Sequence, residues 1–344
     1  MGEVIRIDGL TGEGGGQVLR TSTGLAAFLG LPVRIVNIRA GRKKPGLAAQ
    51  HLAGIKALCR LTGGRAEGLA VGSTEVLLRP GRERKSRLDI DVGTAGSVTL
   101  LLQGLLVALS GTQSRTQLTL RGGTDVAWSP PFLYFSEVLC PLLKTLGFEI
   151  RTNVVRAGFY PKGDGEVQVQ VRAPIALAPL QLDVSAEPDE MTAFSVASDD
   201  LARAKVAERL ISGARSVLPE LKGRKNYFST PSIGCSLVLR FRSGAVLLGA
   251  DSLGERGVRA EEVGRRAAVD LMRQMNAGCS VDRWASDQIL PFLALASSPS
   301  SYIVTELTSH AETNMEIIRK FLPVQFEVTQ VGGAVKVTVV PGKR

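Results

Sequence analysis

The sequence predicts a mixed α/β (α+β) fold, with three repeated β-α-β-α-β-β units in one large domain and a smaller inserted α/β domain. The order of apolar patterns repeats, and the equivalent strands expected at 33–39 and 115–121 lie 82 positions apart. A third copy breaks off after its first strand and resumes about a hundred residues later. The chain of 344 residues is also too long for one small core. We expect residues 1–185 plus 279–344 to form the three-repeat domain and residues 186–278 the inserted one.

The first two units contain the same elements in the same order. For the first unit the pattern predicts a strand at 4–8, a helix near 17–29, a strand at 33–39, a helix near 46–61 and two short strands, the clearer at 73–79. For the second it predicts a strand at 88–92, a helix near 97–109, a strand at 116–121, a helix near 131–146 and strands near 149–154 and 166–172.

The third unit is interrupted by the inserted segment. Its expected elements are a strand at 180–184, a helix near 282–296, a strand at 302–307, a helix near 312–321 and strands near 325–329 and 334–340. The insert is expected to contain a helix at 205–218, strands at 235–241 and 246–250 and a helix at 260–275. Each unit places a loop between its second strand and second helix, at Ala40–Pro45, Gly122–Pro130 and Thr308–Ser309. Pseudo-symmetry would gather these loops on one face, which is a good place for a site.

The charge of the chain is concentrated in one stretch. The net charge is +10, and residues 33–87 contain thirteen Lys and Arg but only three acids. Because Arg grips phosphate through its planar fork, this stretch fits an acidic partner such as RNA, although a solvated basic surface gives the same composition. The four cysteines form no CxxC pair, which argues against a zinc site and fits reduced thiols of a cytoplasmic protein. The longest apolar run is too short for a membrane span.

A glycine-rich turn precedes the first expected helix. It reads Gly12-Glu13-Gly14-Gly15-Gly16-Gln17, and free amides at a helix N-terminus suit phosphate oxygens. It lacks the GK[ST] and GxGxxG signatures, so by itself the motif is better explained as a plain tight turn. Glu13 is an oxygen ligand that could hold a divalent cation bridging phosphates.

A basic loop follows the second expected strand. Arg39, Arg42 and Lys43 lie between a strand end and a helix start, and Gln50 and His51 fall in the first turns of that helix. Such a group would hold a terminal phosphate or a polynucleotide backbone, and the alternative is a solvated loop.

His310 is the candidate nucleophile. The chain has two histidines, and a lone histidine is more often structural than catalytic. His310, however, lies where the third loop meets its helix, within Thr308-Ser309-His310-Ala311-Glu312-Thr313-Asn314. A neutral imidazole can carry a phosphoryl or nucleotidyl group, and a helix N-terminus favours both the neutral ring and phosphate oxygens.

Lys162 offers a competing nucleophile. Lys162-Gly163-Asp164-Gly165 matches the KxDG pattern of nucleic-acid ligases. Its context, from Gly158 to Glu166, instead reads as a turn between two strands, and the later ligase motifs are missing. We interpret this match as a coincidental turn.

Taken together, these segments resemble the RNA 3'-terminal phosphate cyclase family. The resemblance runs nearly end to end and is loosest in the insert. It rests on Ile7–Arg20, Ile38–His51, Gly93–Ser97 with Gln103, Gly122–Pro131, Gly158–Glu166, Asp287-Gln288, His310 and Thr313-Asn314. It implies three β-α-β-α-β-β repeats with an inserted domain. It also implies an ATP-dependent enzyme that closes an RNA 3'-phosphate onto its 2'-hydroxyl through a histidine–AMP intermediate and an RNA(3')pp(5')A intermediate.

The resemblance also implies roles for individual residues. His310 is similar to the nucleophile, Glu13 to the ligand of a divalent metal (Mg²⁺ or Mn²⁺) and Gln103 to a nucleotide or metal contact. Pro131 and Trp284 resemble the pair that sandwiches adenine, although the family often has Tyr at the Trp284 position. Asp287 and Gln288 resemble contacts to histidine or ribose. The group that binds phosphate and the RNA end is implied to be Arg20, Arg39, Arg42, Gln50 and His51.

Two alternatives stay open at this stage. A cyclase-like branch of the family has lost catalysis and acts in ribosome processing, but its members lack the catalytic histidine. Enolpyruvyl transferases share a related repeated architecture and bind small anions, so fold kinship alone does not separate them. The expected partner is RNA with a 3'-phosphate end and no membrane, and the sequence leaves the oligomeric state open.

Overall fold

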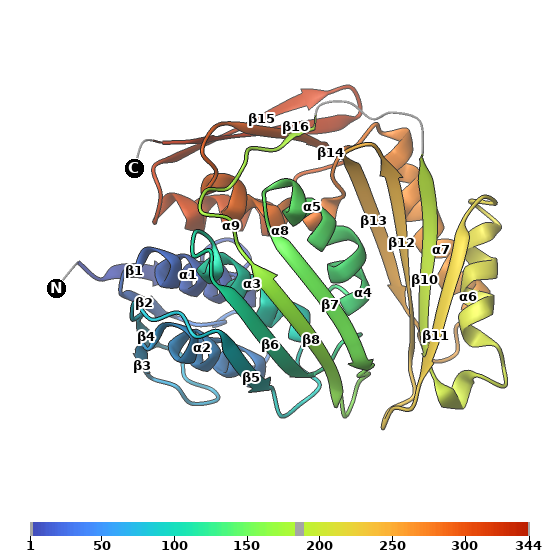
Figure 1. The fold of residues 1–344 in the computed structure, drawn as a ribbon, viewed down its shortest axis with the longest axis horizontal. Helices are drawn as coiled ribbons and strands as arrows, with labels where there is room; N and C mark the ends of the chain where they lie inside the picture. Colours follow the sequence, from blue (N-terminus) through green and yellow to red (C-terminus); the bar gives the residue numbers. More distant parts are fainter. Residues whose placement is uncertain (1–2, 183–188, 343–344) are drawn as a thin grey trace.

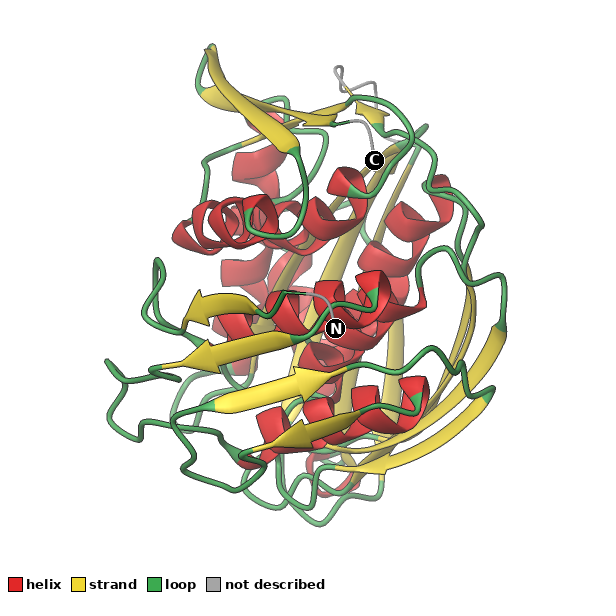
Figure 2. Cartoon of the chain, turned by 90° about the vertical axis from the view of Figure 1, so that its left-hand side faces the viewer, coloured by secondary structure: helices red, strands yellow, loops and turns green. Residues whose placement is uncertain are grey.

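Four sheets of four strands each build the protein in a computed structural model that describes residues 3–182 and 189–342. Figure 1 shows three of the sheets following one another from left to right, with the C-terminal strands across the top. In the view of Figure 2 the helices gather towards the middle, with strands on the outer faces. The helices therefore supply most of the interior on which a site can be built.

The first unit is a sheet with the strand order β1-β2-β4-β3, covered by two helices. Strands β1 and β2 pair in parallel, and the other pairs are antiparallel. Its elements are β1 (Ile5–Asp8), α1 (Gly16–Leu29), β2 (Val33–Val36), α2 (Ala49–Thr62), β3 (Arg65–Glu67) and β4 (Val76–Arg79).

The second unit has the equivalent strand order, β5-β6-β8-β7, again with one parallel pair at its edge. Its second helix is continuous but contains a π-helical segment in the middle. The elements are β5 (Arg87–Asp91), α3 (Val98–Leu109), β6 (Arg115–Gly122), α4 (Phe132–Tyr134), η1 (Phe135–Leu139), α5 (Cys140–Thr145), β7 (Glu149–Arg156) and β8 (Gly165–Arg172).

The third unit completes the pattern with a sheet ordered β15-β16-β14-β9, in which β9 and β14 are the parallel pair. Because all three sheets run first, second, fourth, third, the predicted threefold repeat of β-α-β-α-β-β units is confirmed. The elements are β9 (Gln181–Leu182), α8 (Arg283–Ala294), β14 (Ser300–Val304), α9 (Ser309–Arg319), β15 (Val324–Val331) and β16 (Ala334–Pro341).

The fourth sheet, β11-β10-β12-β13, lies between β9 and α8 in the sequence, and α6 and α7 pack on it around a separate apolar cluster. That residues 186–278 form an independent domain stays a prediction, and its boundary at 185–186 lies outside the described residues, as do positions 183–184 of the strand expected at 180–184. The elements are β10 (Glu190–Ser198), η2 (Asp199–Leu201), α6 (Val206–Arg215), β11 (Lys222–Phe228), β12 (Cys235–Ser243), β13 (Val246–Leu253) and α7 (Ala260–Asn276).

Several expected boundaries were wrong for local reasons. Strand β2 ends at Val36 instead of residue 39, because Asn37 and Arg39 adopt left-handed backbone with φ of 53° and 52°. Helix α2 begins at Ala49 instead of residue 46. Helix α9 begins at Ser309 instead of residue 312, because the Thr308 hydroxyl accepts a hydrogen bond from the Ala311 amide and caps the helix. His310 therefore lies inside the first helical turn.

The central helices are held by a large apolar cluster. Helix α3 is buried on nearly all sides, which explains its almost uninterrupted apolar sequence. It packs against α1 and α2, and α1 in turn packs against α9. Among the residues described, none of the helices combines the length and apolar character needed to cross a membrane.

Candidate active site

The glycine-rich turn before α1 is docked on the first turn of α9. The Glu13 amide donates to the Thr313 hydroxyl over 3.2 Å, and that hydroxyl donates to the Ser309 carbonyl over 2.7 Å. Gly12 has a φ of +57°, and a Cβ there would lie 2.1 Å from Oγ1 of Thr313. Only glycine allows this close approach, so the first and third units meet at this point.

His310 and Glu13 form the centre of the site. Nδ1 of His310 lies 3.0 Å from Oε2 of Glu13, and the Ser309 hydroxyl donates to the other carboxylate oxygen. Burial lowers the pKa of His310; Glu13 opposes that shift, while the charges of Arg20 and Arg42 reinforce it. A neutral imidazole that donates from Nδ1 keeps a lone pair on Nε2. The side chain is 42% exposed, so the ring is accessible from solvent.

Gln17 links three helices beneath His310. Its Nε2 donates to the His310 carbonyl over 3.1 Å and to Oδ2 of Asp287 over 3.3 Å. Burial raises the pKa of Asp287 to about 7, although the Arg20 charge and the Gln17 hydrogen bond oppose this shift. No role was predicted for Gln17, because a polar residue in the first turn of a helix carries no distinctive signal.

A chain of amides and a guanidinium lines a pocket beside Asp287, whose empty space is about 320 Å³ when open solvent is included. Arg20 Nε donates to Oε1 of Gln103, and Nε2 of Gln103 donates to Oε1 of Gln288. Burial lowers the pKa of Arg20 to about 10, and the nearby Asp287 charge opposes the shift. Oε1 of Gln17 is buried here without a hydrogen-bond partner among the described residues, which leaves an acceptor for a bound hydroxyl or water.

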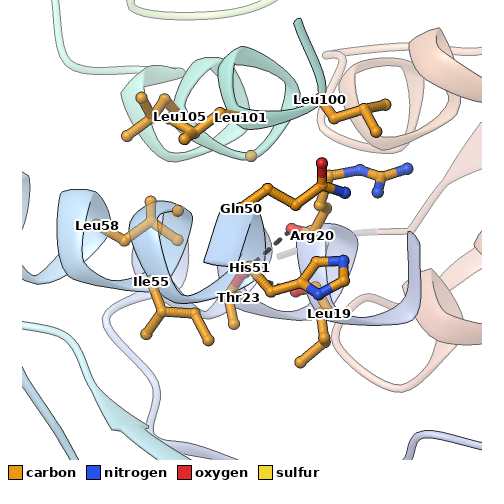
Figure 3. A pocket seen from close by; sticks show the side chains of 12 residues that line it. Leu19, Arg20, Thr23, Gln50, His51, Ile55, Leu58, Leu100, Leu101 and Leu105 are labelled. Carbon is orange, nitrogen blue, oxygen red and sulfur yellow. Dashed lines mark hydrogen bonds between the residues drawn. The ribbon is translucent and has the colours of Figure 1, made fainter. Parts of the chain in front are cut away.

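A second pocket, with about 400 Å³ of empty space when open solvent is included, lies on the other side of Arg20 between α1, α2 and α3. Figure 3 shows Arg20, Gln50 and His51 at its polar end, with leucine and isoleucine side chains behind them. Burial and the charges of Arg20 and Arg39 lower the pKa of His51 to about 3. Since Nδ1 of His51 accepts from the Ala48 amide, the neutral ring carries its proton on Nε2, beside Gly16.

The basic loop reaches the same centre through Arg42. Its guanidinium lies 3.9 Å from Oε2 of Glu13 and donates to the Glu13 carbonyl over 3.4 Å. Arg39 donates to the Gly46 carbonyl, and burial followed by repulsion from Arg42 lowers its pKa. The first and third loops therefore meet at Glu13, as predicted from the repeat.

The second loop makes different contacts from the other two. It joins the turn at residues 93–97 through the Ser97–Gly123 bridge and the Val98 and Gly123 amides. Within the described residues no hydrogen bond or ion pair connects this loop to His310. The turn at residues 93–97 contacts the candidate site directly, because Oε1 of Gln50 accepts a hydrogen bond from the Ser97 amide over 3.1 Å.

Pro131 and Trp284 occupy different surroundings. Pro131 is buried at the start of α4, whereas Trp284 is 39% exposed and stacks on the Arg283 guanidinium, 4.7 Å from the ring centroid. One network connects the helices that carry them. The Tyr134 hydroxyl donates to Oδ1 of Asp282 over 2.6 Å, and the same oxygen caps α8 at the Trp284 amide. That the two rings sandwich adenine stays a prediction.

Lys162 lies in an exposed turn between β7 and β8, which confirms the interpretation of the KxDG match as a turn. Its neighbours Gly163 and Asp164 both adopt left-handed backbone.

Comparison with known proteins gives one consistent result. A family model described as RNA 3'-terminal phosphate cyclase matches residues 11–328. Relatives with that name include one from Methanopyrus kandleri, 40% identical over 94% of this chain and 95% of its own. Another, from Archaeoglobus fulgidus, is 42% identical over 93% of this chain and 96% of its own. Among solved structures, the enolpyruvyl transferase NikO from Streptomyces tendae is 15% identical with a TM-score of 0.30, covering 100% of this chain and 66% of NikO.

Proposed function

Because the chain belongs to the RNA 3'-terminal phosphate cyclase family, we propose that it uses ATP to convert an RNA 3'-terminal phosphate into a 2',3'-cyclic phosphate. The observation that carries the proposal is the contact between Nδ1 of His310 and Oε2 of Glu13. It leaves Nε2 of a neutral, accessible imidazole as the nucleophile, near two pockets that share Arg20.

The first step uses His310. Its Nε2 attacks the α-phosphorus of ATP, so that a P–N bond forms and the P–O bond to pyrophosphate breaks. The ring then carries a positive charge, and the Glu13 carboxylate at Nδ1 stabilises that charge.

The RNA end completes the reaction in two further steps. An oxygen of the 3'-phosphate attacks the same phosphorus, the P–N bond breaks and His310 returns to its neutral form. The product is the RNA(3')pp(5')A anhydride. The adjacent 2'-hydroxyl then attacks the RNA phosphorus, loses its proton to water and expels AMP. Activation is needed because a phosphate monoester has no good leaving group, whereas AMP in an anhydride is one.

The nucleotide is proposed to occupy the pocket on the Asp287 side of Arg20. Gln103, Asp287 and Gln288 line this pocket, and the unpartnered Oε1 of Gln17 suits a ribose hydroxyl. Trp284, one turn before Gln288 on α8, and Pro131 would stack on adenine.

The RNA 3'-phosphate is proposed to bind on the other side, where Arg20, Gln50 and His51 form the polar end of the second pocket. The N-terminus of α1 adds backbone amides that suit an anion. Arg42 lies over this turn and reaches Glu13, and Arg39 lies behind Arg42 in the same loop. The neutral His51 serves as a donor from Nε2 instead of as a charge.

A divalent cation fits this site if phosphates supply most of its ligands. The described residues contain no group of three or more His, Cys, Asp or Glu that could hold a metal unaided. Mg²⁺ and Mn²⁺ commonly bind through one carboxylate and substrate phosphates, and Glu13 is such a carboxylate beside the nucleophile. When bound, the cation would neutralise charge on the phosphates.

Covalent labelling tests the proposal. Incubated with α-labelled ATP and Mg²⁺ or Mn²⁺, the wild-type protein should retain acid-labile label, His310→Ala should retain none and Lys162→Ala should retain it fully. Label lost in the lysine variant and kept in the histidine variant would refute the mechanism. Absence of label and of cyclic product in wild type would favour the other branch, a cyclase-like RNA-processing factor without catalysis.

A further inference from the structure

Three loops from distant parts of the chain meet at one end of the molecule. They are residues 123–131 after β6, residues 157–164 after β7 and residues 229–234 before β12, all at the lower end of Figure 1. Asp125 bridges to Phe159, and the Lys162 amide donates to the Ser232 hydroxyl over 3.1 Å. Asp125 also accepts from the Ser236 hydroxyl over 2.6 Å. These bonds fix the three loops to one another.

Each loop exposes a large apolar side chain. Trp128 is 98% exposed, Tyr160 is 75% exposed and Ile233 is 64% exposed. Trp128 also has a φ of 67°, a left-handed backbone conformation that bulky residues rarely adopt. An indole presented to solvent on a strained backbone contributes little to folding, so these side chains point to a ligand.

This surface continues into the proposed RNA-end site through the turn at residues 93–97. On one side of the turn, Oε1 of Gln50 accepts from the Ser97 amide. On the other side, a Cβ at Gly163 would lie 2.7 Å from Cα of Ala95, so the loop that carries Tyr160 and Lys162 packs directly on the turn. An RNA chain with its 3' end beside Gln50 would therefore cross this turn to reach the side chains of Trp128 and Tyr160.

We propose that Trp128 and Tyr160 form a stacking platform for unpaired bases just upstream of the RNA 3'-phosphate. The inference rests on the proposed function, because that function places the 3' end beside Gln50. Bases of single-stranded RNA stack on exposed aromatic rings with little regard to sequence. Lys162, exposed in the same loop and more than 4 Å from every carboxylate of the described residues, supplies a cation for the backbone.

Fluorescence tests the platform without requiring catalysis. The chain has two tryptophans, so Trp284→Phe leaves Trp128 as the only one while keeping an aromatic ring at position 284. A 3'-phosphorylated hexanucleotide should quench Trp128 emission, and ATP alone should not. The same oligonucleotide with abasic upstream positions should bind without quenching. An unchanged emission while a labelled hexanucleotide is bound, as measured by anisotropy, overturns the proposal, as does quenching by ATP alone.

Substitution gives the second arm. Trp128→Asn suits the left-handed backbone, so the variant should fold at least as stably as wild type. Combined with Tyr160→Ala, it should weaken binding of the hexanucleotide about 10-fold or more, with self-adenylation and binding of a dinucleotide 3'-phosphate unchanged. Ile175→Ala, an exposed apolar residue (67%) between β8 and β9, is the matched control and should change neither.

The outcomes separate the platform from the activity. Equal weakening of hexanucleotide and dinucleotide binding overturns the platform. A change of oligomeric state in the double variant also overturns it, because the exposed side chains would then contact another protein molecule. If RNA quenches Trp128 in the Trp284→Phe variant while wild type never labels His310, the proposed reaction fails and the platform stands.

Discussion

Nδ1 of His310 lies 3.0 Å from Oε2 of Glu13, and this contact is one of several that join the first and third units at the candidate active site. The two residues come from opposite ends of the chain, one from the turn before α1 and the other from the first turn of α9. The contact decides which imidazole nitrogen is free. Chemistry at His310 therefore depends on packing between repeats that are far apart in the sequence.

Replacing Glu13 by Gln should slow self-adenylation about 10–100-fold, because a hydrogen bond to a charged partner contributes about 1.5–3 kcal/mol. Glu13 opposes the lowering of the His310 pKa, so its loss should shift the acidic limb of the rate profile to lower pH. Single-turnover adenylation measured against pH tests both effects. An unmoved limb, with the rate restored by raised Mg²⁺ or Mn²⁺, would show that Glu13 acts only on the metal.

Arg42→Ala should impair cyclisation of a 3'-phosphorylated oligonucleotide more than self-adenylation. Arg42 lies over the turn beside Glu13, where the RNA phosphate is proposed to bind, so the loss falls on the later steps. The two steps can be followed separately with labelled ATP and with labelled RNA. Lys44→Ala, at an exposed position of the same loop to which no role is assigned, is the charge-matched control. Equal loss of both steps in Arg42→Ala would contradict an RNA-end role.

Tyr134→Phe should destabilise the fold by about 1–3 kcal/mol, because buried Asp282 loses a donor 2.6 Å away. The substitution should also raise the KM for ATP, since this bond connects the helices that carry Pro131 and Trp284. Urea unfolding and steady-state kinetics measure the two effects. Tyr227→Phe removes a hydrogen bond of the same length, from Tyr227 on the fourth sheet to Glu208 on α6, and should leave the KM for ATP unchanged. If Tyr134→Phe leaves the KM for ATP unchanged, the bond to Asp282 does not position Pro131 and Trp284 for adenine.

Gly12→Ala should cost more stability than Gly332→Ala, although both glycines have φ near +60°. At Gly332 nothing lies within 4 Å of a new Cβ, so only the backbone cost of about 1–2 kcal/mol applies. At Gly12 the Cβ would also strike Thr313 and push the turn off α9, so adenylation should fall as well. Thermal unfolding of the pair tests the difference, and equal losses would mean that the turn is not docked as described.

Acid should destabilise wild type more than His51→Gln. The folded-state pKa of His51, about 3, lies below its unfolded value of about 6.5. The unfolded chain therefore binds a proton that the folded one does not, and stability present above pH 6.5 is lost as the pH falls towards 3. At pH 5 this contributes about 2 kcal/mol. The raised pKa of Asp287 acts in the opposite direction, but it is present in both proteins. The free energy of unfolding, measured with denaturant at pH 7 and at pH 5, should therefore differ less in His51→Gln than in wild type.

Much of the fold could be predicted because its elements obey local rules. Amphipathic periodicity located the repeated helices and strands, and glycine and proline marked their ends. Strands β10 and β11 were missed because neither shows alternating apolar and polar residues. Strand β10 is buried on both faces, and β11 (Lys222–Phe228) is an exposed edge strand. The start of α9 was misplaced because the capping role of Thr308 was not recognised.

The sequence by itself determined the threefold repeat, the glycine-rich turn, the basic loop and the choice of His310 over Lys162 as the candidate nucleophile. Each of these depends on the order of residue types along the chain. Only the tertiary structure decided that Glu13 holds Nδ1 of His310, that Gln17 bridges His310 and Asp287, and that Arg20 separates two pockets. Protonation and access depend on burial and on charges brought together from distant segments, and no local pattern encodes those distances.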